Sequence, residues 1–242
     1  MIMDYNDFYE LVKTRRSIHR FKPDPVPDEH VEKILELARW APSGANSQPW
    51  EFVVIRDKSL KQKIVEIHKQ SQTESKRMEL SREERLRHPT AYMVNTWADP
   101  GYLGAPVWIM LLGDPRYKET FLVHPLLTYG DENFYSSLAN TFVCIHLAAR
   151  SLGLGSQWMT SSALPFMQAL LHDILGIPRG FYIYDMACIG FPAEQPRPRL
   201  VRPLDEMVHH DRYDMSKYRT DEQVLKHIEE VSRARQEAMR RG

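Results

Sequence analysis

The chain has 242 residues, of which 43% are hydrophobic, enough to bury a sizeable core in one large domain. Lysine and arginine balance aspartate and glutamate at 32 each, so no net basic charge points to nucleic acid. The first residues are acidic and lack an apolar stretch, and the longest apolar run, near 105–112, is too short for a bilayer span. We therefore expect a cytoplasmic protein that binds neither nucleic acid nor membrane.

Hydrophobic periodicity and turn residues predict a mainly helical chain. In chain order, we expect helices over 4–16 and 28–40, a strand over 51–55, a helix from 59 to about 69, a strand over 106–112, helices over 134–151 and 164–175, and a strand over 182–191. The interval 70–87 is highly charged, which indicates either a solvated helix or a mobile flap. Strands and helices do not alternate regularly, and this favours the α+β class.

A last helix is expected over 220–239, apart from the rest. Thr220 and Gln223 can form a capping box, and Val224, Ile228 and Val231 fall on one helical face. A helix with such an apolar face needs a surface to cover.

Two groups of reactive side chains carry little functional signal. Cys144 and Cys188 lie in apolar segments without a second cysteine or a histidine nearby, so we expect two buried free thiols rather than a disulfide. His209, His210 and Asp211 are consecutive, so their side chains point in different directions, and a solvated tail is the better interpretation than a metal site. We expect no metal.

The first segment with a chemical signature is 15–21, which reads Arg-Arg-Ser-Ile-His-Arg-Phe. Arginine guanidinium groups and a serine hydroxyl are the donors that hold a phosphate through charge-assisted hydrogen bonds. The second segment, 41–50, reads Ala-Pro-Ser-Gly-Ala-Asn-Ser-Gln-Pro-Trp and leads into the strand 51–55. Turn residues of this kind let backbone amides approach a flat ligand closely, although they also occur in ordinary turns.

Together these segments resemble the nitroreductase family of FMN-dependent oxidoreductases. The resemblance continues in Gly153–Ser161, in Ile189–Glu194 and in the basic stretch Arg197–Leu200, so it spans roughly residues 13–205. It implies an α+β fold with a central, mainly antiparallel sheet flanked by helices, in an intertwined homodimer. On this basis residues 1–208 form the FMN-binding domain, and 209–242 form a C-terminal extension that embraces the partner subunit.

The resemblance also implies which residues contact the cofactor. Arg15 and Ser17 would hold the phosphate and ribityl end, Arg197 and Arg199 would add charge there, and the loop 42–48 would border the flavin ring across the dimer interface. The backbone at 159–161 would lie near flavin N5. The full set of expected FMN contacts is Arg15, Arg16, Ser17, His19, Pro42, Ser43, Gly44, Asn46, Gln48, Met159, Thr160, Ser161, Arg197 and Arg199.

No side chain is expected to act as an acid or base, because the flavin carries the redox chemistry. The family's chemistry implies NAD(P)H as the electron donor, a ping-pong cycle, and a small electrophile such as a nitroaromatic or quinone as acceptor. Two positions depart from the family: His19 replaces a usual Arg or Lys, and Cys144 replaces a helix Asn. Whether His19 or Arg20 faces the flavin stays open.

Three alternatives remain. Reductive dehalogenation, as in the deiodinases, uses a lid with a Glu, a Tyr and a Lys, but no lysine occurs here between Arg77 and Lys118. Flavin fragmentation is compatible with every residue assigned above. A flavin-binding sensor or storage protein without turnover would share the same contacts.

Overall fold

The computed structural model describes residues 4–84, 87, 104–195 and 199–240. The chain divides into two compact units, Met1–Gln195 and Pro196–Gly242. The second unit therefore begins before His209, where the extension was expected to start. Each unit is described by itself below, and the assignment of two functional domains stays a prediction.

The first unit contains five helices and four strands among its described residues. These are α1 (Tyr5–Thr14), α2 (Asp28–Ala38), β1 (Trp50–Ile55), α3 (Lys58–Leu80), β2 (Val107–Gly113), α4 (Val123–Ser151), β3 (Gly155–Met159), α5 (Pro165–Leu175) and β4 (Tyr182–Gly190). The strands form one sheet in the order β1-β2-β4-β3, and every neighbouring pair is antiparallel. The predicted α+β class and antiparallel sheet are confirmed.

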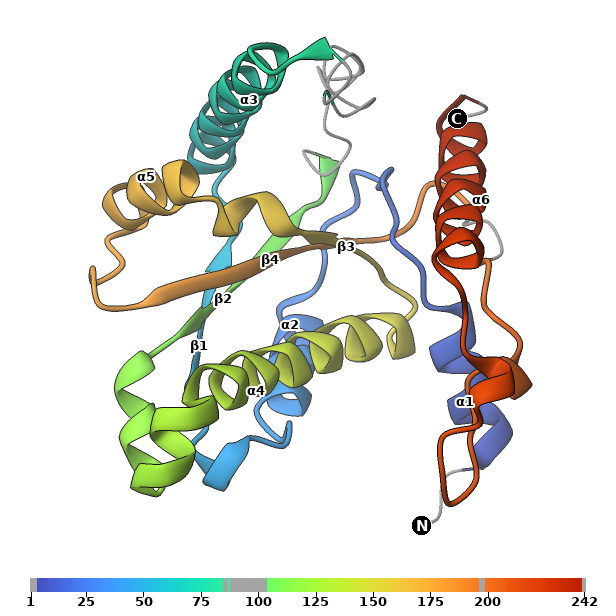
Figure 1. Ribbon diagram of the computed structural model, residues 1–242. Coiled ribbons are helices and arrows are strands. Elements are labelled where there is room, and N and C mark those ends of the chain that lie inside the picture. Colours follow the sequence, from blue (N-terminus) through green and yellow to red (C-terminus); the bar gives the residue numbers. More distant parts are fainter. Residues whose placement is uncertain (1–3, 85–86, 88–103, 196–198, 241–242) are drawn as a thin grey trace. The chain divides into compact units, whose positions relative to one another are not determined.

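The sheet has a separate apolar core on each face. Figure 1 shows α2 and α4 on one side and α3 and α5 on the other. Along the fully buried β2, Val107, Ile109 and Leu111 pack with residues of α2 and α4, whereas Trp108 and Met110 pack with residues of α3 and α5. This alternation follows from the two-residue repeat of a strand. The uninterrupted apolar sequence of β2 is therefore that of a strand covered on both faces.

Two helices are longer than the sequence predicts. α3 continues to Leu80 through the charged stretch, where Arg77 and Glu74 form an ion pair of 2.7 Å three residues apart. The solvated-helix interpretation of this stretch is therefore correct as far as Leu80. α4 begins at Val123 rather than near residue 134, and its backbone departs from helical geometry at Tyr129, where φ is −148°. Pro125 and Gly130 obscure the helical pattern in these early turns.

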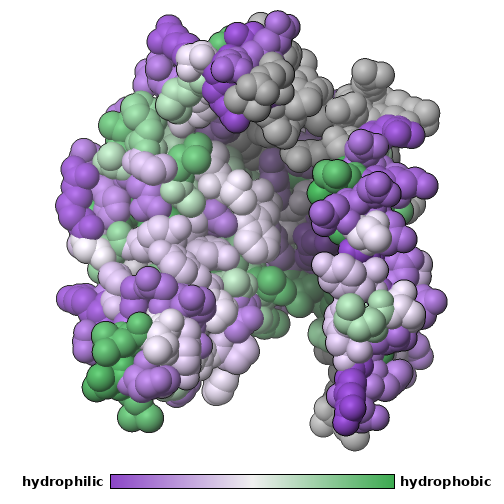
Figure 2. Space-filling model, viewed as in Figure 1, coloured by the Kyte–Doolittle hydropathy of each residue, from purple (hydrophilic) through white to green (hydrophobic). Residues whose placement is uncertain are grey.

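The start of α4 also exposes a patch of apolar side chains. Leu122, Val123 and Leu127 are exposed by 79%, 71% and 79%, and Figure 2 shows apolar surface over this end of α4. Elsewhere Cys188 is buried and Cys144 is half-buried, and both are free thiols. The expectation that both would be buried is wrong for Cys144, because it lies at the margin of the α4 core. In the part of the chain that is described, no helix combines the length and apolarity of a bilayer span.

The second unit contains short 3-10 turns at Leu204–Glu206 (η7) and Met215–Lys217 (η8), followed by α6 (Asp221–Arg240). The predicted capping box is present. The Thr220 amide donates to Gln223 Oε1 at 2.9 Å, and the Gln223 amide donates to Thr220 Oγ1 at 3.3 Å. This reciprocal pair satisfies two backbone donors at the start of α6.

Candidate cofactor-binding site

The cationic segment that follows α1 is joined to the edge of β3. Ser17 forms a parallel bridge with Ser156, and the Ile18 amide donates to the Ser156 carbonyl at 3.1 Å. The Ile18 side chain is buried against Gly155, where a Cβ atom would lie only 2.7 Å from Ile18 Cγ1. Gly155 therefore lets the segment approach β3 closely, while Ser17 and His19 stay exposed.

The other end of the same segment is joined to the residues that follow β4. The Lys22 amide donates to the Phe191 carbonyl at 2.8 Å, and the Ala193 amide donates to the Arg20 carbonyl at 2.9 Å. The carboxylate of Glu194 accepts the amides of His19 and Arg20 at 2.6 and 3.2 Å. Segment 17–22 is thus paired along its length, although it contains no regular strand.

A buried polar group lies beneath this junction. His146 Nδ1 lies 2.7 Å from Ser156 Oγ, and its ring stacks on Trp158 with centroids 5.4 Å apart. Burial, aided by the positive charge of Arg15, lowers the pKa of His146 to about 3, so the ring is neutral at physiological pH. A neutral ring can be buried here without a counter-ion.

Trp158 connects this group to a buried carboxylate on β4. Its Nε1 donates to Asp185 Oδ2 at 2.6 Å. Burial raises the pKa of Asp185 to about 6, and the hydrogen bond from Trp158 partly opposes that rise. Asp185 and Ser156 therefore contact neighbouring side chains of one aromatic cluster under α4, in which Phe142 meets the Trp158 ring edge-on at 4.6 Å.

The loop 42–48 is held by α4 instead of by the sheet. The Gly44 amide donates to Ser137 Oγ at 3.1 Å, and Asn140 Nδ2 donates to the Pro42 carbonyl at 3.2 Å. The missing side chain of Gly44 makes room for the Phe121 ring, which would lie 3.1 Å from a Cβ there. These contacts fix the loop from outside.

The loop backbone itself is strained. Ala45, Asn46 and Gln48 have φ angles of 51°, 51° and 47°, in the left-handed region that residues other than glycine rarely occupy. Strain of this kind persists where the surrounding structure enforces it, and it is frequent at ligand-binding sites. The Gln48 amide is tied back to Ser43 Oγ at 3.0 Å, which closes the turn.

The third expected element is the end of β3 and the 3-10 turn Thr160–Ala163 (η6). Met159 is buried in the core next to α3 and α5, so only its backbone could reach a ligand. Thr160 is exposed and Ser161 is half-buried. The structure thus brings Arg15, Arg16, Ser17 and His19 to the strand that carries Met159–Ser161.

Unpartnered polar atoms mark this region as suited to a polar ligand. Arg16 Nε, Gln157 Oε1 and Ser161 Oγ are buried and lack a hydrogen-bond partner. Such atoms cost free energy unless a ligand or water satisfies them. A cofactor with phosphate, hydroxyl and ring nitrogen groups offers both acceptors and donors, so the residues present fit FMN. Gln157 was not among the expected contacts, although it lies inside the segment that carried the resemblance.

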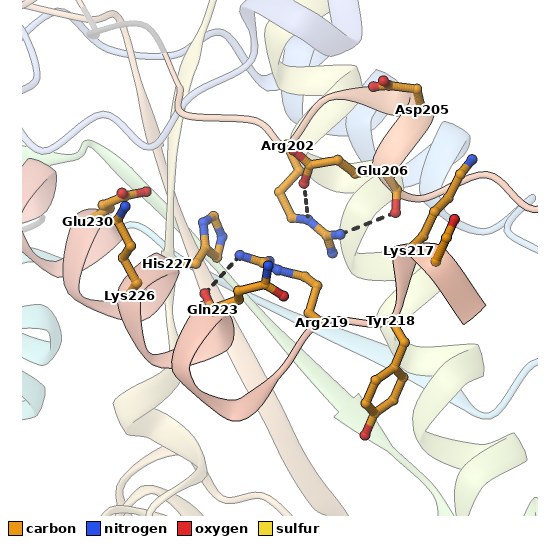
Figure 3. Close-up of a pocket in the computed structure, with 11 residues that line it drawn as sticks. Arg202, Asp205, Glu206, Lys217, Tyr218, Arg219, Gln223, Lys226, His227 and Glu230 are labelled. Carbon is orange, nitrogen blue, oxygen red and sulfur yellow. Dashed lines mark hydrogen bonds and ion pairs between the residues drawn. The ribbon is translucent and has the colours of Figure 1, made fainter. Parts of the chain in front are cut away.

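Two expected contacts lie beyond Gln195. Arg197 falls outside the described residues, and Arg199 belongs to the second unit. That unit has a cavity of about 450 Å³, drawn in Figure 3. Its charged lining is largely paired within the unit: Arg202 Nε lies 3.4 Å from Glu206 Oε2, and Arg219 Nη2 donates to the Gln223 carbonyl at 3.0 Å. None of the expected FMN contacts lines this cavity.

Within the described ranges, no group of three or more histidine, cysteine, aspartate or glutamate residues could hold a metal ion. His209 stacks on Tyr213 at 4.1 Å and accepts the Asp214 amide at 3.1 Å. These contacts agree with a structural rather than a ligating role for His209.

Comparison with known proteins defines the class to which this fold and site belong. The model of the nitroreductase family matches residues 12–191, and the chain belongs to that family. Over 209 residues it is 28% identical to an iodotyrosine deiodinase of Nematostella vectensis, an alignment covering 84% of this chain and 74% of the relative. It is 29% identical, over 80% of this chain and 81% of the relative, to a Methanothermobacter thermautotrophicus protein named provisionally as an NADH dehydrogenase/NAD(P)H nitroreductase.

Solved structures of the same fold include two flavoproteins. A BluB-like flavoprotein from Clostridium difficile superposes with a TM-score of 0.69 at 24% identity, covering 87% of this chain and all of that one. An oxidized iodotyrosine deiodinase bound to FMN and 3-iodo-L-tyrosine superposes with a TM-score of 0.64 at 20% identity, covering 85% and 99% of the two chains. At these identities the likeness establishes the fold alone.

Proposed function

We propose that this chain binds FMN and reduces small electrophiles, nitroaromatics or quinones, with electrons from NAD(P)H. The observation that carries the proposal is the set of unpartnered buried atoms, Arg16 Nε, Gln157 Oε1 and Ser161 Oγ, beside a paired cationic segment. Family membership and relatives named for NAD(P)H nitroreductase activity support it.

The chain's own residues would bind and orient the cofactor. Arg15 and Ser17 would hold the phosphate and ribityl end, with Arg197 and Arg199 adding positive charge. The loop 42–48 would border the ring system, and the backbone at 159–161 would lie at its N5 edge. Bound FMN would supply the hydride chemistry, taking electrons from NAD(P)H and passing them to the acceptor in a ping-pong cycle.

We also propose a homodimer, in which the second unit covers the partner. Val224, Ile228 and Val231 on α6 are exposed by 41%, 55% and 44%, so this apolar face is open to a second surface. Deleting residues 220–242 should weaken dimerisation or flavin retention in sedimentation experiments. A wild-type monomer that holds FMN tightly would contradict the dimer.

The decisive experiment begins with the absorption spectrum and cofactor mass of the purified protein. We expect non-covalent FMN, and steady-state oxidation of NADH or NADPH that depends on a nitroaromatic or quinone acceptor. Arg15→Ala should weaken FMN binding by about 1.5 to 3 kcal/mol, the range for hydrogen bonds to charged groups. Arg39→Ala is a matched control, because Arg39 pairs with Glu36 on the surface of α2. FAD in place of FMN, or FMN without turnover, would overturn the proposal.

A second candidate is reductive dehalogenation, favoured by the iodotyrosine deiodinases among the relatives. Offering 3-iodo-L-tyrosine and a nitroaromatic to the reduced protein separates the two activities. The absence of lysine between Arg77 and Lys118 makes the nitroaromatic the expected acceptor.

A further inference from the structure

Glu194 makes a contact that the flavin contacts above do not explain. A single carboxylate oxygen, Oε1, accepts two successive backbone amides, from His19 at 2.6 Å and from Arg20 at 3.2 Å. These partners lie 175 and 174 residues away in the sequence. The contact therefore joins the chain just after β4 to the cationic segment at the start of the fold.

This geometry constrains the path of the backbone. In a regular extended strand, successive N–H groups point to opposite sides, so two of them cannot reach one oxygen. The chain must turn between His19 and Arg20 for both amides to face Glu194. Two consecutive amides that converge on one oxygen form an anion-binding concavity, and hydrogen bonds to a carboxylate are stronger than those to a neutral acceptor.

The bonds on either side of this turn show what it separates. Before it, Ile18 donates to Ser156 of β3, and after it, Arg20 accepts from Ala193 and Lys22 donates to Phe191. The segment thus passes from the edge of β3 to the end of β4 at the point where Glu194 binds. Without that anchor, the amides of His19 and Arg20 would lose their acceptor, and the direction in which the residues on either side project would be less restricted.

We infer that Glu194 is a positioning residue of the flavin site. Through the amides of His19 and Arg20, it holds the cationic segment in the conformation that presents Arg15, Ser17 and His19 to FMN. This inference rests on the proposed FMN function for its effect on binding, whereas the backbone anchor itself does not depend on flavin.

The test compares Glu194→Ala with Glu194→Gln in the full chain. The glutamine keeps a carbonyl oxygen that can accept the same amides, whereas alanine keeps none. We expect FMN to bind roughly tenfold more weakly to Glu194→Ala and within about threefold of wild type to Glu194→Gln, because one charge-assisted contact is lost or weakened. Glu32→Ala, on the exposed side of α2, is the matched control and should leave FMN binding unchanged.

Equal losses in both variants would show that charge matters and not the anchor, and would overturn the inference. Unchanged or tighter FMN binding in Glu194→Ala would also overturn it, since a carboxylate that merely repels phosphate would act in that direction. Amide hydrogen exchange of the flavin-free protein gives a separate readout. Exchange at His19 and Arg20 should accelerate in Glu194→Ala, while Ile18, bonded to Ser156, stays protected.

The exchange experiment also separates this inference from the proposed function. If wild-type protein binds no FMN, the proposed function fails, and exchange at His19 and Arg20 alone decides whether the anchor exists. Unchanged exchange at both amides would refute the anchor even in a protein that binds FMN.

Discussion

The two backbone segments that the flavin proposal assigns to the site are held in different ways. Segment 17–22 is paired through backbone hydrogen bonds with β3 and with residues 191–193. The loop 42–48 has left-handed backbone at three non-glycine residues and is held to α4 through Ser137 and Asn140. Backbone pairing tolerates changes in side chains, whereas a loop held by side chains depends on a few of them. Substitutions should therefore affect the two segments through different positions.

The largest effect is expected at the contact between segment 17–22 and β3. Gly155→Ala would place a Cβ atom 2.7 Å from Cγ1 of the buried, β-branched Ile18. Overpacking of this kind should lower the free energy of unfolding by about 2 to 3 kcal/mol, measured by urea denaturation. Gly180→Ala is the control, because nothing lies within 4 Å of its added Cβ. Equal stability of the two variants would show that the segment is not packed against β3.

The next effect concerns acid, and it acts on the residues beneath the same junction. The folded-state pKa of His146 is about 3, below its ordinary 6.5, so the unfolded chain binds more protons between these values. Its contribution to stability is present at neutral pH and is lost as the pH falls below about 6.5, by roughly 2 kcal/mol between pH 7 and 5. His146→Gln should remove this dependence in urea titrations at the two pH values.

Asp185 acts in the opposite sense. Its folded-state pKa of about 6 lies above its ordinary 3.8, so the folded chain binds more protons between these values and gains stability as the pH falls through them. Asp185→Asn should therefore make the protein more acid-sensitive than wild type, by roughly 1 kcal/mol between pH 7 and 5. If all three proteins show the same pH slope, neither group is buried as described.

A smaller effect is expected where the loop meets α4. Ser137→Ala leaves the Gly44 amide without its partner and should cost about 1 kcal/mol of stability. Ser136→Ala is a close control: both hydroxyls donate to the Asn133 carbonyl, but only Ser137 also accepts from the loop. Amide exchange at Gly44 should accelerate in the first variant alone. The comparison of the two segments fails if Ser136→Ala loosens the loop equally.

The smallest effect is expected within the loop, and it has the opposite sign. Ala45 has a φ of 51°, which glycine adopts without a steric penalty. Ala45→Gly should raise the free energy of unfolding by about 0.5 kcal/mol, after the greater freedom of glycine in the unfolded chain is subtracted. Ala193→Gly, at a residue without positive φ, should lower it by a similar amount. A loss of stability in Ala45→Gly would show that the loop is unstrained.

Local patterns in the sequence were sufficient for most of the regular elements. Helix α2, the central strands and the capping box of α6 depend on residues within a few positions of one another, so periodicity and capping preferences predict them. The FMN segments were recognised from their motifs for the same reason. The early turns of α4 were missed, because proline and glycine interrupt a pattern that tertiary packing nonetheless makes helical.

Only the tertiary structure decided what surrounds those motifs. His146 contacts Ser156, Trp158 contacts Asp185, and Glu194 reaches His19 across most of the chain, and none of these pairs leaves a periodic signal. The pKa values of His146 and Asp185 depend on burial, which the strands and α4 create together. Residue types and short spacings thus determined which chemistry the chain could support. Contacts between residues distant in sequence decided where each group lies, because chain folding alone brings them together.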